Sequence, residues 1–144
     1  MNNNKNLTGL YYSKIVKSLK YLEYSYNHTL SMPLNPADMT DPQLEAWDGF
    51  ASRFARTSDI FLSKYIRAFI VKDDPAYDGS FRDQLNKAEK FGLIDDTNTW
   101  MEIRELRNAT VHEYSDQDLE KIFEKFRKYS PLLLALSKKL SDET

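Results

Sequence analysis

The sequence predicts an all-α protein, an up-and-down bundle of four to five helices built from a single domain over residues 1–144. Apolar residues recur along most of the chain at the spacing of an α-helix, which has about 3.6 residues per turn. The chain holds only four glycines, and β-branched residues nowhere alternate with polar ones over a strand's length. Long helices joined by short loops favour an antiparallel, up-and-down arrangement.

The first helix is predicted from about Leu7 to Leu30, after a polar tail of residues 1–6. Prolines in the segment 31–36 end it. One face carries its larger apolar residues, which are Tyr12, Ile15, Val16, Leu19, Leu22, Tyr26 and Leu30. Tyrosine is dense along the whole helix, at Tyr11, Tyr12, Tyr21, Tyr24 and Tyr26. We assign these rings to packing or to a subunit interface rather than to base stacking, because aromatic residues at helical spacing usually belong to a core.

Four further helices are predicted to open with a reciprocal capping pair, a small polar residue followed three positions later by an acid or amide. The pairs are Thr40 with Gln43, Ser80 with Asp83, Thr99 with Glu102, and Ser115 with Asp118. The second helix then covers about residues 41–72 and the last about 116–140. Gly92 is expected to end the third helix, since glycine readily adopts the left-handed conformation of a helix C-terminus.

The second helix has an aromatic face and a basic face. The aromatic face holds Trp47, Phe50, Phe54, Phe61, Tyr65 and Phe69, and the basic stripe holds Arg53, Arg56, Lys64 and Arg67. At about 1.5 Å per residue the stripe is roughly 20 Å long, enough to follow several phosphates of an RNA strand. A solvated face whose charges pair with acids of neighbouring helices explains the same pattern, and the sequence leaves both interpretations open.

Composition excludes several kinds of site. The chain has no cysteine and only two histidines, so disulfides, thiolate zinc sites and histidine-built metal clusters are excluded, and we expect neither a metal nor a cofactor. The start MNNNKNLTGL has no signal-peptide core, and the longest apolar run, Leu132–Leu136, is far below the ~20 residues of a membrane span. We therefore expect a cytoplasmic protein without membrane contact. Its net charge of −2 restricts any nucleic-acid binding to local patches.

Residues 104–114 read RELRNATVHEY and concentrate the polar side chains suited to catalysis. On a helical wheel the inner face holds Ile103, Leu106 and Thr110, with Trp100 and Val111 beside it. Arg104, Asn108 and His112 align on another face, whereas Arg107 lies about 140° from His112. A shared site therefore needs an arginine that reaches around the helix, a distorted helix end or a second subunit. Histidine carries protons near neutral pH and arginine holds phosphate, a combination that suits metal-independent RNA cleavage by the 2′-hydroxyl. The alternative for His112 is a polar helix-end residue favoured by the helix dipole.

The segment Arg107-Asn-Ala-Thr-Val-His112 resembles the signature of HEPN-domain proteins. Its continuation to Tyr114 resembles the HepT branch, the toxin half of HEPN/MNT toxin-antitoxin pairs. The preceding FGLIDD of residues 91–96, with Trp100, is similar to the corresponding run in nucleotidyltransferase-associated HEPN proteins. The specific similarity thus covers about residues 91–114, and the bundle architecture extends it to most of the chain.

The resemblance implies a homodimeric, metal-independent ribonuclease. Arg107 would bind and polarise the scissile phosphate, His112 would act as acid and base, and Asn108 would orient the site. The cognate minimal nucleotidyltransferase, acting as antitoxin, would silence the toxin by attaching AMP to Tyr114. A tyrosine packed in the turn between two helices is the plain structural alternative for Tyr114.

Three hypotheses follow for the whole protein. The first is the ribonuclease toxin, with RNA or tRNA as substrate and with Arg104 and the basic stripe of the second helix as RNA-binding residues. The second is a non-catalytic HEPN module that presents a substrate or nucleotide to a nucleotidyltransferase. The third is a helical bundle used for protein contacts, in which the motif is accidental. The acidic net charge is unusual for a ribonuclease and makes the first hypothesis depend on the basic stripe.

Overall fold

The computed structural model describes residues 3–108 and 114–142, and within these ranges every regular element is a helix. The α-helices are α1 (Asn3–Thr29), α2 (Asp41–Asp59), α3 (Ile66–Asp73), α4 (Phe81–Lys90), α5 (Thr97–Leu106), α6 (Asp116–Leu134) and α7 (Leu136–Lys139). A 3₁₀ turn, η1 (Pro36–Asp38), precedes α2, and a π-helical segment, η2 (Ile60–Tyr65), joins α2 to α3. The all-α prediction is confirmed. No helix in these ranges has the length and hydropathy that a membrane span requires.

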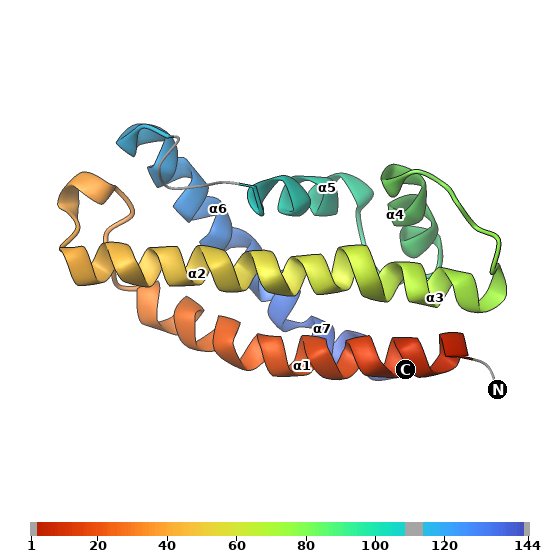
Figure 1. Ribbon diagram of the computed structural model, residues 1–144. Coiled ribbons are helices and arrows are strands. Elements are labelled where there is room, and N and C mark those ends of the chain that lie inside the picture. Colours follow the sequence, from red (N-terminus) through yellow and green to blue (C-terminus); the bar gives the residue numbers. More distant parts are fainter. Residues whose placement is uncertain (1–2, 109–113, 143–144) are drawn as a thin grey trace.

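One continuous helix, formed by α2, η2 and α3, runs through the middle of the molecule (Figure 1). α1 packs antiparallel along one side of it, and α4 and α5 lie on the opposite side. α6 crosses behind the continuous helix and contacts α1, α2 and α5. The bundle therefore brings α1, α2 and α5 onto one face of the molecule, where the candidate site lies.

Three of the four predicted capping pairs are confirmed by the hydrogen bonds of their residues. Thr40 with Gln43 and Ser80 with Asp83 form reciprocal capping boxes, and the Ser115 hydroxyl accepts a hydrogen bond from the Asp118 N–H. Gly92 has φ +78°, as predicted. The amides of Gly92 and Leu93 donate to the carbonyls of Glu89 and Ala88, which closes α4 with two hydrogen bonds.

Two predicted helix starts are wrong. Asp96 caps α5 in place of Thr99, because its carboxylate accepts hydrogen bonds from the Asn98 and Thr99 amides. An ionised carboxylate is the stronger acceptor at this position, so the helix begins at Thr97. The Thr99 hydroxyl also donates to this carboxylate. Its hydrogen bond is the main cause of a lowered pKa of Asp96, and the two amide hydrogen bonds lower the pKa further. α1 begins at Asn3 rather than about Leu7, so most of the predicted polar tail is helical.

The tyrosines of α1 divide into two groups. Tyr11, Tyr12 and Tyr26 pack against the core, and the Tyr12 hydroxyl donates a hydrogen bond of 2.7 Å to the Ser137 carbonyl. Tyr21 and Tyr24 are 48% and 63% exposed. The assignment to packing is therefore confirmed for the first group. For Tyr21 and Tyr24 the exposure excludes packing within the chain, and the other branch of the assignment, a subunit interface, stays a prediction.

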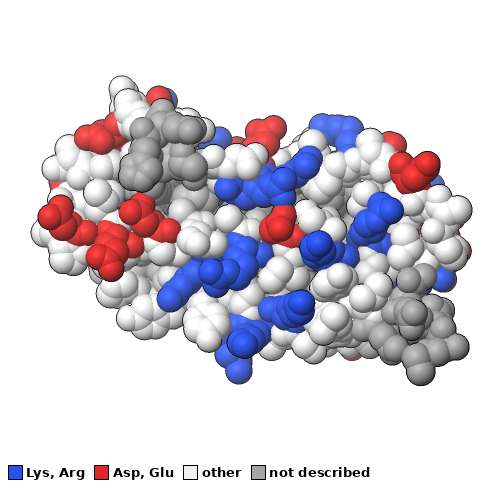
Figure 2. All heavy atoms as spheres, viewed as in Figure 1, with Lys and Arg blue, Asp and Glu red and all other residues white. Residues whose placement is uncertain are grey.

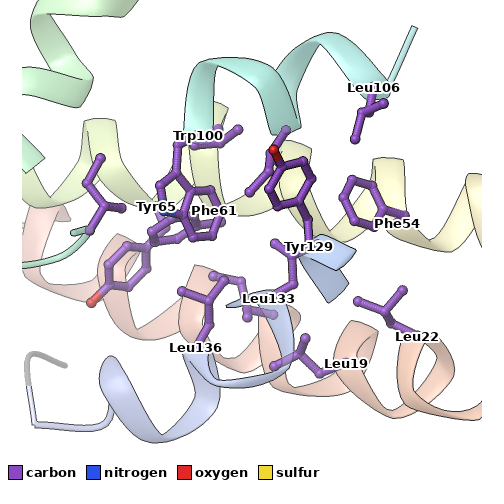
Figure 3. Close-up of a cluster of buried hydrophobic side chains, with 14 of the residues drawn as sticks. Leu19, Leu22, Phe54, Phe61, Tyr65, Trp100, Leu106, Tyr129, Leu133 and Leu136 are labelled. Carbon is purple, nitrogen blue, oxygen red and sulfur yellow. The ribbon is translucent and has the colours of Figure 1, made fainter. Parts of the chain in front are cut away.

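The predicted aromatic face of the continuous helix forms the centre of the core (Figure 3). Its fully buried members are Trp47, Phe50, Phe54, Phe61 and Tyr65, while Phe69 is half-buried. α5 adds the buried side chains of Trp100, Ile103 and Leu106, as the wheel predicted. Thr110 and Val111, predicted for the same inner face, lie outside the described residues.

Trp47 joins three parts of the fold. Its ring stacks on Phe123 of α6 with centroids 4.6 Å apart, and its indole N–H donates to the Pro33 carbonyl at 3.0 Å.

We expect Trp47→Ala to reduce the free energy of unfolding by about 3 to 5 kcal/mol, because it removes a fully buried aromatic side chain. Urea denaturation measures this loss. Leu132→Ala, at a side chain 38% exposed, is the control, and a loss at Trp47 no larger than that of the control would contradict the assignment.

Candidate functional site

Arg107 lies where α5 ends. The helix stops at Leu106, and the amides of Arg107 and Asn108 donate to the carbonyls of Arg104 and Glu105, each at 3.2 Å. These bonds span three residues rather than four, which tightens the last turn. The angle of about 140° between Arg107 and His112 was calculated for one unbroken helix. α5 ends at Leu106, so this calculation does not apply to Arg107. A distorted helix end was one of the arrangements that would allow a shared site, and Arg107 lies just past the end of α5. His112 lies outside the described residues, so the shared site stays a prediction.

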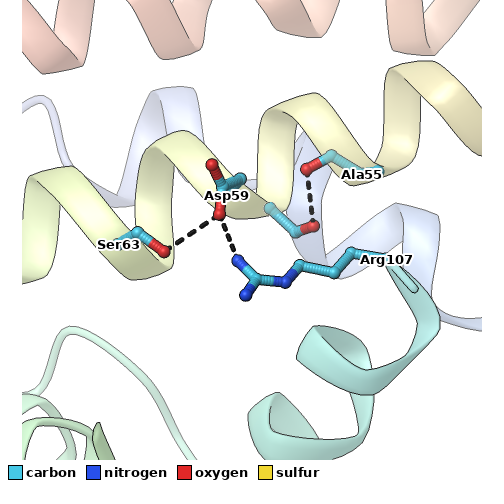
Figure 4. A network of polar contacts seen from close by, with 5 residues as sticks. Ala55, Asp59, Ser63 and Arg107 are labelled. Carbon is cyan, nitrogen blue, oxygen red and sulfur yellow. Dashed lines mark hydrogen bonds and ion pairs between the residues drawn. The ribbon is translucent and has the colours of Figure 1, made fainter.

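The guanidinium of Arg107 forms an ion pair with Asp59, at the end of α2 (Figure 4). The Ser63 hydroxyl, one turn further along in η2, donates to the same Asp59 oxygen at 3.0 Å. The Arg107 side chain is 28% exposed and that of Asp59 is 46% exposed. Asp59 thus holds Arg107 against the continuous helix while both groups remain in contact with solvent.

Asp59 was not among the residues predicted for the site. It is the only acid between Asp48 and Asp73, a run of sequence that otherwise carries the basic stripe. A single acid within a basic stretch could have been singled out from the sequence as a candidate partner for a cation. The partner of Asp59 follows only from the packing of α5 across α2, which the sequence did not reveal.

The ion pair borders a shallow, open depression of about 360 Å³. Its lining residues are Ala55, Arg56, Asp59, Arg107 and Asn108. Two guanidinium groups and one carboxylate leave an excess of one positive charge. Arg56 is exposed and forms no ion pair with any described residue. The depression is therefore suited to an anion, and Asn108 adds a neutral side chain that both donates and accepts hydrogen bonds.

The basic stripe keeps its charge. Arg56, Lys64 and Arg67 are exposed, and none of them pairs with an acid in residues 3–108 or 114–142. Figure 2 shows Lys and Arg side chains gathered over the middle of this face and Asp and Glu side chains over the end where α2 begins. Among the described residues no ion pair neutralises these cations, so the stripe is a solvated basic face, and RNA binding along it stays a prediction.

Two of the predicted RNA-binding arginines have specific contacts. Arg53 donates hydrogen bonds to the Tyr21 carbonyl and the Ser25 hydroxyl, at 3.1 and 3.0 Å. Arg104 stacks its guanidinium over the ring of Phe81 in α4 at 3.9 Å. Arg104 is absent from the lining of the Arg107 depression, so the structure does not bring these two arginines of α5 into one site.

A polar cluster fixes α5, and with it Arg107, against α6. Glu102 of α5 accepts a hydrogen bond from the buried Tyr129 and pairs with Lys125 at 2.8 Å. Hydrogen bonds from Lys125 and Tyr129 lower the pKa of Glu102. The hydrogen bond to Glu102, together with burial, raises the pKa of Tyr129 to about 12. The tyrosine therefore stays protonated at neutral pH and remains a donor to the carboxylate.

Tyr114 lies directly before Ser115, the residue that caps α6, and its side chain is 41% exposed. This exposure fits a side chain that an enzyme can reach, and the modification of Tyr114 stays a prediction.

The family model described as nucleotidyltransferase substrate binding protein like matches residues 11–142. The match takes in nearly the whole bundle, including most of α1, the continuous helix and the Arg107 segment. No curated protein matches the chain.

Proposed function

The chain belongs to the nucleotidyltransferase substrate-binding-like family, a HEPN-type helical family linked to nucleotidyltransferase systems, and we propose that it is the ribonuclease toxin of such a system. In this proposal it cleaves RNA, with tRNA as one candidate, without a metal ion. A partner nucleotidyltransferase neutralises it by attaching AMP to Tyr114. The observation that carries the proposal is the depression at Arg107, the arginine of the HEPN-like motif, whose lining has an excess of positive charge.

Two features of this face support phosphate binding at the depression. Arg107 and Arg56 present two guanidinium groups, each able to hold phosphate oxygens through paired N–H donors. The exposed Lys64 and Arg67 continue the positive charge along the continuous helix. A local surface of this kind offsets the net charge of −2, which had counted against RNA binding.

The proposed reaction is a transesterification within the RNA. The 2′-hydroxyl loses its proton to a base and forms a bond to the adjacent phosphorus, while the bond from phosphorus to the 5′-oxygen breaks and the leaving oxygen takes up a proton. We assign proton transfer to His112 and stabilisation of the extra phosphate charge to Arg107. Asn108 would orient the scissile phosphate.

A homodimer would supply the second proton carrier. The reaction needs both a base and an acid, whereas the motif provides His112 alone. Two copies with their α5 ends facing each other across a two-fold axis would bring two sets of Arg107 and His112 together.

The first test is cleavage of RNA by the purified protein in the presence of EDTA. We expect His112→Ala and Arg107→Ala to slow cleavage by about 10² to 10⁴-fold, since each removes a group that acts in the transition state. Gel analysis of labelled tRNA measures the rate. Arg82→Ala, which removes an exposed arginine of α4, is the matched control. Cleavage at the unaltered rate in both site variants would overturn the proposal.

The second test concerns Tyr114. On co-expression with the cognate nucleotidyltransferase and ATP, the phenol oxygen should attack the α-phosphate, with pyrophosphate as the leaving group. We expect the intact mass to rise by whole AMP units, and Tyr114→Phe to abolish the increase because it removes the attacking oxygen. Tyr24→Phe should retain the increase, although Tyr24 is the more exposed tyrosine. An unchanged mass increase in Tyr114→Phe would exclude Tyr114 as the modified residue.

One observation favours a second candidate function, a non-catalytic module that presents a substrate or nucleotide to the nucleotidyltransferase. The carboxylate of Asp59 already engages Arg107, so the guanidinium is partly neutralised before any phosphate arrives. A binding module needs only reversible exchange of carboxylate for phosphate, whereas a ribonuclease also needs Arg107 free to bear transition-state charge.

Asp59→Asn separates the two candidates, because the amide can still accept the Ser63 hydrogen bond but carries no charge. The free energy of unfolding should change by less than about 1 kcal/mol, since both groups of the pair are partly exposed and screened by solvent. RNA affinity should rise by up to about 5-fold, the equivalent of about 1 kcal/mol. Fluorescence anisotropy measures binding, with Asp73→Asn as control. Cleavage in both wild type and variant supports the ribonuclease, tighter binding without cleavage supports the module, and unchanged affinity would show that Asp59 does not compete with phosphate.

A further inference from the structure

A second cavity, separate from the Arg107 depression, opens between α1 and α2. It has a volume of about 570 Å³, within the range of small-molecule sites. Tyr24, Ser25 and His28 of α1 line one wall, and Pro42, Glu45, Ala46, Asp48, Gly49 and Arg53 line the other. Of these residues, only Arg53 was predicted from the sequence to bind a ligand.

The α1 wall of this α1–α2 cleft is aromatic and exposed. The rings of Tyr24 and His28, one turn apart, lie at an interplanar angle of 23° with centroids 5.5 Å apart. Tyr24 is 63% exposed, the largest exposure among the large hydrophobic and aromatic side chains of the described chain. Such a ring offers a flat, unburied surface on which a second ring can stack.

Arg53 is fixed at the inner end of the cleft. Its guanidinium lies 5.6 and 5.9 Å from the ring centroids of Tyr21 and Tyr24, and its two hydrogen bonds to α1 hold it there. Because the side chain is already ordered, a ligand phosphate that binds it incurs little further loss of conformational entropy.

Gly49 keeps the opposite wall open. Glycine inside a helix costs about 0.5 to 1 kcal/mol relative to alanine. A Cβ atom built at Gly49 would have no neighbour within 4 Å, so packing within the described chain does not explain the glycine. The wall is therefore open at this position, opposite the exposed ring of Tyr24.

We propose that the α1–α2 cleft binds a nucleobase and its phosphate. The base stacks on Tyr24, its exocyclic amino group donates to a carboxylate of the opposite wall, Glu45 or Asp48, and the phosphate contacts Arg53. Adenine, cytosine and guanine carry such an amino group and uracil does not. This contact with the amino group explains why acidic side chains line a site for an anionic ligand.

The position of the cleft links it to the Arg107 depression, so this proposal rests on the proposed function. Arg53 in the cleft and Arg56 in the depression are three residues apart on α2, about 4.5 Å along the helix axis. One RNA strand would then place its scissile phosphate at Arg107 and a neighbouring base in the cleft. A free nucleotide offers the same base and phosphate, and the experiment distinguishes these two sources.

The test measures binding of fluorescein-labelled hexa-adenylate and hexa-uridylate to the full chain carrying His112→Ala, so that any cleavage is suppressed. Hexa-adenylate should bind more tightly than hexa-uridylate. Tyr24→Ala should weaken hexa-adenylate binding by about 5- to 150-fold, the loss of one stacking contact. Tyr24→Phe, which keeps the ring, should stay within a few-fold of the parent.

Gly49 supplies an independent pair of variants. Gly49→Leu should fill the cleft and weaken hexa-adenylate binding as Tyr24→Ala does, whereas Gly49→Ala should not, because its Cβ meets open space. Circular dichroism and thermal unfolding should show both variants folded. If Gly49→Leu does not fold, the pair Tyr24→Ala and Tyr24→Phe decides the matter.

The outcomes separate this proposal from the ribonuclease. Loss of hexa-adenylate binding in Tyr24→Ala with no cleavage by wild type would support the cleft and overturn the ribonuclease. Cleavage that depends on Arg107, with hexa-adenylate binding unaffected by Tyr24→Ala, would overturn the cleft alone. If AMP binds with the same dependence on Tyr24 and hexa-adenylate does not bind, the cleft takes a free nucleotide rather than RNA.

Discussion

The burial of the aromatic face of the continuous helix is the constraint on which the rest of the structure depends. Fully buried rings from Trp47 to Tyr65 fix the rotation of this helix about its axis. Once that rotation is fixed, Arg56, Lys64 and Arg67 must face solvent. Both the Arg107 depression and the α1–α2 cleft have one wall on this helix. Core packing therefore also determines where the charge of the surface lies.

Net charge describes this surface poorly. The chain carries −2 overall, yet basic side chains gather over the middle of one face and acidic ones at the end where α2 begins (Figure 2). Opposite charges separated by more than about 10 Å are largely screened at 0.1 M salt, so an RNA strand near the middle responds mainly to the nearby cations. An acidic protein can thus offer a local site for phosphate without being a general polyanion binder.

Local signals in the sequence predicted the fold well, and tertiary contacts explain what they missed. Capping pairs and the aromatic periodicity concern residues within one or two turns, and they located the starts of α2, α4 and α6 correctly. The π-helical segment η2, the end of α5 at Arg107 and the pairing of Arg107 with Asp59 depend on how α5 crosses α2. The capping pattern at Thr99 correctly indicated a helix start nearby. The carboxylate of Asp96, three residues earlier, caps the helix instead, so α5 begins at Thr97.

The Asp59 ion pair is compatible with a functional Arg107 for an energetic reason. Partly exposed ion pairs contribute about 0 to 1 kcal/mol, because solvent screens them. A phosphate held by Arg107 and Arg56 together replaces one carboxylate contact by two charge-assisted contacts, so the exchange has a small cost and a larger gain. Until that exchange, Asp59 keeps the guanidinium near the depression instead of free in solvent. On this account the carboxylate orders the empty site, and phosphate displaces it when the site is filled.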